Sequence, residues 1–139
     1  MKFGIATKAI IFNKNNEVLL ITKSDNDEIN PNTVDIPGGR LEFGEKVEES
    51  LQREIQEETG LSVTIIAPSR VWGFTKNDLH LVGITFAVNL AEENDVKLSF
   101  EHNEFRWIKA DEILNKDFPS WIKEEIEAAQ KIKNNFPIK

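Results

Sequence analysis

Residues 39–61 read GRLEFGEKVEESLQREIQEETGL, and this stretch decides the fold class. A helix is predicted from Val47 to Thr59, because Leu51 and Ile55 follow Val47 at i+4 and i+8 and form one apolar face. Gly60 predicts the end of that helix, since glycine readily adopts the left-handed conformation of a C-terminal cap. We therefore expect an amphipathic helix that lays its apolar face on a core.

Three glutamates occupy the other side of this predicted helix. Glu54, Glu57 and Glu58 stand at i, i+3 and i+4, so their carboxylates project in similar directions. Carboxylates that crowd together repel one another unless a cation lies among them, and such oxygen ligands suit a hard ion such as Mg²⁺ or Mn²⁺. The alternative is a solvated acidic face, which is the usual meaning of a glutamate-rich helix.

A glycine-rich turn precedes the helix and favours the metal-site interpretation. Residues 37–39 are Pro-Gly-Gly, and glycines allow the backbone to approach a ligand closely. A free carbonyl in this turn would be one more oxygen ligand. The predicted acidic stripe also borders the apolar stripe of the helix, which places it near the edge of the core.

The remainder of the chain alternates strands and helices, which predicts an α/β domain with a mixed sheet. The first two strands form a predicted hairpin, and the tail from residue 133 is expected to fray. The predicted strands are 3–12, 18–21, 34–36, 61–67, 79–90 and 105–108; the loop is 24–32; a helical turn covers 111–114 and a helix covers 120–132.

Composition limits both the size of the protein and its partners. The chain has 139 residues, of which 40% are hydrophobic, so one domain is expected over 1–139. A net charge of −7 argues against duplex nucleic acid as a partner, whereas a bound cation still allows a small phosphorylated ligand. The absence of cysteine excludes thiolate chemistry. No apolar run is long enough to cross a bilayer, and a cytoplasmic location is expected.

The stretch 39–61 resembles the signature of the Nudix hydrolases, G-x5-E-x7-R-E-U-x-E-E-x-G-U, in which U is a bulky aliphatic residue. The matching positions are Gly39, Glu45, Arg53, Glu54, Ile55, Glu57, Glu58, Gly60 and Leu61. The resemblance implies a Nudix fold, an α/β/α sandwich around a mixed β-sheet. It also implies metal-dependent hydrolysis of a diphosphate linkage in a nucleoside triphosphate or another nucleoside-diphosphate derivative.

The same resemblance implies roles for individual residues. The expected metal ligands are Glu54, Glu57, Glu58 and the carbonyl of Gly38, with Mg²⁺ as the ion and Mn²⁺ as a substitute. Glu45 is expected to support the metal site indirectly, and Arg53 to orient the carboxylates. The general base is either a glutamate of residues 39–61 (the box), Glu57 or Glu58, or the downstream Glu104, for which a solvated turn carboxylate is the alternative. Glu101 is a weaker alternative to Glu104.

Recognition of the substrate is less constrained by the sequence. Trp72 and Phe74, with Arg70 nearby, either stack on a base or fill the core, and the core is favoured. Trp107 is expected in the core, while His102 and Lys8 are expected at the surface. The alternatives to a triphosphate are ADP-ribose, a nucleotide sugar, or a catalytically silent nucleotide-binding domain. A homodimer is left open.

Overall fold

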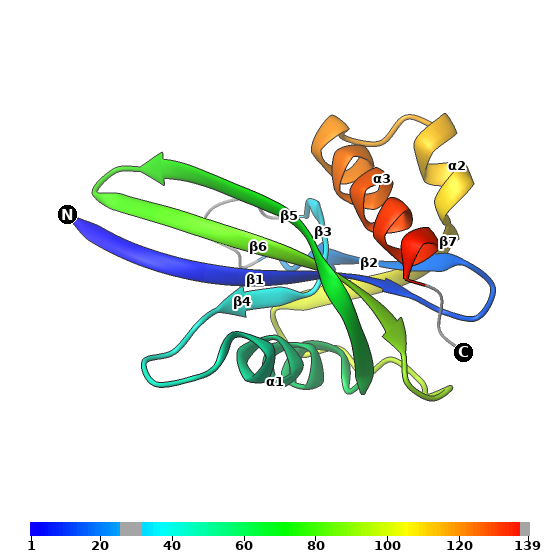
Figure 1. Ribbon diagram of the computed structural model, residues 1–139, viewed down its shortest axis with the longest axis horizontal. Coiled ribbons are helices and arrows are strands. Elements are labelled where there is room, and N and C mark those ends of the chain that lie inside the picture. Colours follow the sequence, from blue (N-terminus) through cyan, green and yellow to red (C-terminus); the bar gives the residue numbers. More distant parts are fainter. Residues whose placement is uncertain (26–31, 137–139) are drawn as a thin grey trace.

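One mixed sheet separates two layers of helix in the computed structural model, which describes residues 1–25 and 32–136 (Figure 1). Helix α1 lies on one face, and α2 and α3 lie on the other, so the predicted α/β/α sandwich is confirmed. The elements are β1 (Lys2–Phe12), β2 (Glu17–Lys23), β3 (Val34–Asp35), β4 (Gly38–Arg40), α1 (Val47–Thr59), β5 (Val63–Lys76), β6 (Leu79–Leu90), β7 (His102–Lys109), α2 (Ala110–Asn115) and α3 (Ser120–Asn135).

The sheet is built around β1. Its strand order is β3-β2-β1-β6-β5, with β4 paired to β1 and β7 paired to β2. Strands β1 and β6 run parallel, while β1 and β2 form the predicted antiparallel hairpin with Phe12 opposite Val18. The mixed sheet inferred from the sequence is therefore confirmed.

Strand β1 is apolar over its second half because both of its faces are covered. Ile10 and Phe12 pack in the cluster that contains the apolar face of α3. Ala9 and Ile11 point to the opposite face and pack with Leu51 and Ile55 of α1 in a second cluster. Burial on both faces removes the alternation of polar and apolar residues that a half-exposed strand would show.

A change of partner along β1 creates the place where the site forms. The C-terminal end of β1 pairs with β2, but earlier in the strand Thr7 lies opposite Gly39 and Lys8 opposite Gly38 of β4. The glycine pair thus forms a short strand on the α1 side of the molecule, where β4 contacts α1. This strand was not predicted, because a sequence of two glycines indicates a turn.

Several predicted boundaries were too short. Strand β5 runs to Lys76 and not to residue 67, because Pro68 interrupts the pattern and the pairing with β6 shifts register on both sides of it. Helix α3 continues to Asn135, so the fraying predicted from Lys133 is wrong up to that residue, and positions 137–139 lie outside the described residues. The Lys133 ammonium lies 4.4 Å from the centre of the Phe12 ring and donates to Asn16 Oδ1 at 3.0 Å, which holds the last turn. The predicted loop 24–32 lies largely outside the described residues.

The indole ring of Trp72 lies flat on β6 at Gly83. A Cβ atom at Gly83 would fall 2.1 Å from the Trp72 ring, so only glycine fits beneath it. The indole N–H donates to Thr85 Oγ1 at 3.0 Å, and the Phe74 ring stacks beside the indole with 6.1 Å between ring centres. Trp72 is therefore half-buried and Phe74 is exposed, in partial agreement with the expected core position.

We expect Gly83→Ala to lower the free energy of unfolding by about 1–3 kcal/mol, because the new methyl group must displace the Trp72 ring. Urea unfolding followed by tryptophan fluorescence measures the change. Gly4→Ala is the control, since its Cβ would meet only the flexible end of Leu81 at 3.1 Å. Equal stability of the two variants would contradict this packing.

Candidate metal and diphosphate site

Glu58 is the most enclosed carboxylate of the α1 acidic face. Its residue is 5% exposed, and Oε1 accepts a hydrogen bond from the backbone N–H of Gly38 at 2.7 Å. Gly38 has a φ of 147°, and a Cβ there would lie 2.0 Å from the Thr7 carbonyl oxygen. A side chain at position 38 would thus force β4 away from β1 and remove the N–H that holds Glu58.

Three side chains from the sheet surround Glu58. His102 Nδ1 lies 3.8 Å from Glu58 Oε2, and His102 Nε2 lies 3.9 Å from Asp35 Oδ2. Lys8 Nζ contacts Asp35 Oδ2 at 3.3 Å and donates to the carbonyl oxygen of Ile36 at 3.2 Å. Burial raises the pKa of Glu58 to about 7, although Lys8, Gly38 and His102 each act to lower it.

Glu54 is seated against the second glycine of the pair. A Cβ at Gly39 would lie 2.4 Å from the Glu54 carboxyl carbon, so the absence of a side chain gives the carboxylate its place beside the backbone. Burial raises the pKa of Glu54, and the charges of Glu57 and Glu101 act in the same direction. Arg53 opposes this rise through an ion pair of 3.1 Å.

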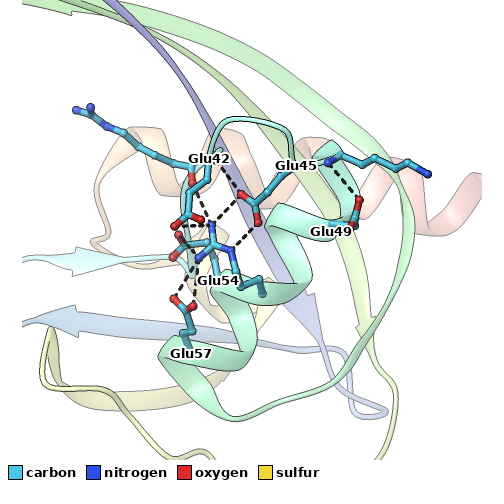
Figure 2. Close-up of polar contacts among 8 residues, drawn as sticks. Glu42, Glu45, Glu49, Glu54 and Glu57 are labelled. Carbon is cyan, nitrogen blue, oxygen red and sulfur yellow. Dashed lines mark hydrogen bonds and ion pairs between the residues drawn. The ribbon is translucent and has the colours of Figure 1, made fainter.

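Arg53 forms hydrogen bonds and ion pairs with several acidic side chains around the start of α1 (Figure 2). Its guanidinium forks onto Glu45, with Nε at 2.6 Å from Oε2 and Nη2 at 3.0 Å from Oε1. Nη1 donates to both Glu57 oxygens at 3.2 Å, and Glu42 lies within 3.7 Å of Nη2. The bond from Arg53 holds the pKa of Glu45 at about 2, and Glu45 in turn raises the pKa of Arg53.

The carboxylates of α1 provide the oxygen ligands that a hard cation requires. Their side chains, however, do not all point to one position, although the spacing in the helix predicts it. Among residues 1–25 and 32–136, no group of three acidic or histidine side chains forms a ready-made metal cluster. Glu54 and Glu57 lie with Arg53, while Glu58 lies with Lys8, Asp35 and His102. Yet Glu54 and Glu58 are both desolvated carboxylates seated on adjacent glycines. A cation would offset the burial that raises both pKa values.

The downstream acidic candidates differ in their relation to the box. Glu104 is exposed on β7 opposite Thr22, and within the described part of the chain no hydrogen bond or ion pair joins it to the box. Glu101 precedes β7 and lies near enough to Glu54 to raise the pKa of that carboxyl. The electrostatics therefore relate Glu101, rather than Glu104, to the box.

The predicted substrate residues lie on the α3 side of the sheet. Trp72 shares a face with Thr85, to which its N–H is bonded, and residue 87 of the same strand face packs with α3. The Arg70 guanidinium is held by α3, at 2.6 Å from Glu125 Oε1 and 3.3 Å from Glu124 Oε2. Arg70 therefore ties α3 to β5, which leaves little of its charge available for a phosphate.

Two expectations about surface residues are wrong. His102 was expected at the surface but is 7% exposed, because it packs between β3 and α1. Lys8 was expected to be solvated but bonds Asp35 and Ile36 at the point where β1 turns from β4 to β2. Asp35 itself was not considered. Nothing in the local pattern indicates this group, since its members come from β1, β3 and β7. Trp107, expected in the core, is partly buried against the α1-side cluster.

Comparison with known proteins places the chain in a family. Residues 2–129 match the NUDIX domain family, so the chain belongs to the Nudix hydrolases. It is 29% identical over 113 residues to the nucleoside triphosphatase NudI of an Escherichia coli strain, a match covering 71% of this chain and 77% of that protein.

Solved structures agree with the fold. The MutT protein from Methanosarcina mazei has a TM-score of 0.80 and 29% identity, covering 93% of this chain and 94% of that one. A C. elegans Ap4A hydrolase has a TM-score of 0.78 and 18% identity, covering 96% and 99% of the two chains. The E. coli dihydroneopterin triphosphate pyrophosphohydrolase has a TM-score of 0.72 and 19% identity, covering 94% and 95%. The last two likenesses concern the fold alone. Within the described residues, no helix has the length and apolarity needed to span a membrane.

The raised pKa of Glu58 predicts a pH dependence of stability without metal. The folded protein binds the Glu58 proton with a pKa of about 7, against 4.5 for an ordinary glutamate. Stability is therefore lost as pH rises from about 4.5 to about 7. We expect Glu58→Gln to remove this loss and to raise the free energy of unfolding at pH 8 by roughly 2–3 kcal/mol, with little effect below pH 4.5.

Denaturant unfolding in EDTA at pH 4 and pH 8 measures this effect. Glu57→Gln, the same substitution at an exposed position of α1, is the matched control. A Glu58→Gln protein that is no more stable than the wild type at pH 8 would show that Glu58 carries no such burial penalty.

Proposed function

We propose that this chain is a divalent-metal-dependent pyrophosphohydrolase that cleaves a diphosphate linkage in a nucleoside triphosphate or another nucleoside-diphosphate derivative. The observation that carries the proposal is the close approach of two carboxylates, the partly buried Glu54 and the buried Glu58, to the adjacent glycines 39 and 38. The likeness to a nucleoside triphosphatase supports a triphosphate substrate. The Ap4A and dihydroneopterin triphosphate hydrolases share only the fold, and their substrates remain alternatives.

In this proposal Glu54 and Glu58 hold the ion, assisted by Glu57 and the Gly38 carbonyl. When bound, Mg²⁺ or Mn²⁺ would offset charge on the diphosphate oxygens and lower the pKa of an attacking water. Arg53 keeps Glu45 and Glu57 in place through its forked hydrogen bonds. A box glutamate, Glu57 or Glu58, or the downstream Glu104 would accept a proton from the water. The effect of Glu101 on the pKa of Glu54 keeps Glu101 as an alternative to Glu104.

The nucleoside portion has two candidate positions. A pocket of about 410 Å³ opens on the far side of Asp35 and is lined by Lys23, Thr33, Val34, Asp35, Pro119 and Trp121. It offers an aromatic ring that is 42% exposed, a cation and a carboxylate, which is the composition of a small-molecule site. Trp72 is separated from the glycines of β4 by β6 and β1. We therefore favour the pocket at Trp121 over the alternative of a base stacked on Trp72 and Phe74.

A substrate panel tests the activity. The purified protein is incubated with Mg²⁺ and nucleoside triphosphates, dinucleoside polyphosphates, nucleotide sugars or ADP-ribose, and released phosphate and pyrophosphate are measured. We expect turnover of at least one member, abolished by EDTA and lowered about 100-fold or more in Glu58→Gln, because that variant loses a charged ligand. Glu127→Gln on the exposed side of α3 is the control. If nucleotides bind but none is cleaved, the catalytically silent domain becomes the better description.

A matched pair of variants tests where the nucleobase of the substrate binds. Trp121→Leu is expected to raise KM several-fold with little change in kcat, because a stacking surface for the nucleoside is lost. Trp72→Leu makes the same substitution on β5 and is expected to leave KM near its wild-type value. The reverse result would move the nucleoside to Trp72 and favour the stacking alternative left open by the sequence.

A further inference from the structure

A buried imidazole lies between two carboxylates on the side of Glu58 that faces the sheet. The His102 side chain is 4% exposed, its Nδ1 lies 3.8 Å from Glu58 Oε2, and its Nε2 lies 3.9 Å from Asp35 Oδ2. Among the described residues, Nδ1 of His102 is buried without a hydrogen-bond partner. A buried polar atom without a partner costs free energy. The carboxylate oxygen that Nδ1 faces is Glu58 Oε2, which at 3.8 Å lies just beyond hydrogen-bond distance.

The ring is fixed by its backbone as well as by its neighbours. His102 is the first residue of β7 and lies opposite Lys23 at a register shift in the pairing with β2. Its backbone N–H donates to the Ser99 carbonyl at 3.2 Å, and the N–H of Ser24 donates to the carbonyl of Glu101 at 2.9 Å. An unbroken ladder would pair Lys23 with Asn103. The register shift brings His102 opposite Lys23 instead, and its side chain faces Glu58 of α1.

Asp35 is anchored independently of His102. Lys8 Nζ lies 3.4 Å and 3.3 Å from the two Asp35 oxygens and donates to Ile36 on the same segment. Burial acts to raise the pKa of Asp35, but Lys8, His102 and Lys23 outweigh it and hold the pKa at about 2. Asp35 is therefore a fixed anion behind the imidazole, and it also lines the pocket at Trp121.

We propose that His102 is a positioning residue, anchored by Asp35, that holds the Glu58 carboxylate in the orientation needed to bind the metal ion. The inference rests on the proposed function for the role of Glu58. The Gly38 N–H holds Oε1 of that carboxylate from the backbone side, and His102 faces Oε2. A second donor, closing from 3.8 Å onto Oε2, would set the plane of the carboxylate, which the Gly38 N–H alone leaves free to rotate. Partners of this kind orient metal-binding side chains in many proteins.

Metal affinity distinguishes positioning from simple packing. We expect His102→Leu to weaken Mn²⁺ binding on the order of 10–100-fold, because the apolar side chain fills the space but donates no hydrogen bond. His102→Asn is expected to recover much of the affinity, since its amide N–H occupies nearly the position of Nδ1. Free Mn²⁺ measured by electron paramagnetic resonance gives the affinities. His80→Leu, at the only other histidine of the chain, is the control.

Thermal unfolding of the same metal-free variants separates the alternatives. A packing role predicts that both His102 variants lose stability while Mn²⁺ affinity stays within twofold of the wild type, and this result would overturn the proposal. Equal losses of affinity in the Leu and Asn variants would also overturn it, because the donated hydrogen bond would then be irrelevant. A graded loss, with Leu weaker than Asn and Asn weaker than the wild type, would support it.

The closing comparison keeps this inference apart from the proposed function. If Mn²⁺ affinity falls in the order wild type, His102→Asn, His102→Leu but the wild type cleaves no nucleotide, the hydrolase activity is rejected and the role of His102 is retained. A protein that cleaves nucleotides with unchanged Mn²⁺ affinity in His102→Leu would retain the activity and reject the role. A wild-type protein that binds no Mn²⁺ would reject both.

Discussion

The hydrogen bond from the Gly38 N–H to Glu58 is the interaction on which the site depends. It joins α1 to β4, and β4 in turn exists because β1 changes partner from β2 to β4 along its length. A glycine is required at position 38, where φ is 147° and the Thr7 carbonyl leaves no space for a Cβ. Helix α1 and strand β4 therefore approach closely for two reasons: Gly38 has no side chain, and its N–H bonds the Glu58 carboxylate. This close approach removes water from the carboxylate that would bind the metal ion.

Two cations, Arg53 and Lys8, divide the acidic side chains near this contact into two groups. Arg53 holds Glu45 and Glu57 at the exposed end, and Lys8 with Asp35 forms a second charged group beneath Glu58. Glu54 lies between the two, close to Gly39. Arg53 is shared among Glu45, Glu54 and Glu57, and Lys8 pairs with Asp35. The electrostatic demand for a metal ion is greatest at Glu54 and Glu58, the two carboxyls whose pKa values burial raises.

Local patterns predicted the elements that bury one continuous apolar stripe. Helix α1 begins and ends where the spacing and Gly60 indicate, and β6 has the predicted bounds. Strand β5 was underestimated because Pro68 and the register shifts interrupt the alternation, although pairing with β6 sustains the strand. Helix α3 was underestimated because its last turn is held by a contact between Lys133 and the Phe12 ring, 121 positions away along the chain, which no local propensity reports.

The sequence by itself determined the family and the set of side chains that the box presents, because the glycines, the arginine and the glutamates lie close together along the chain, in a turn, a loop and one helix. It did not determine which of those glutamates is buried, or which side chains face it. Lys8, Asp35 and His102 reach Glu58 only when β1, β3 and β7 assemble around the change of partner in β1. Burial and long-range pairing arise from the packing of distant segments, and for that reason the surroundings of Glu58 were decided by the tertiary structure alone.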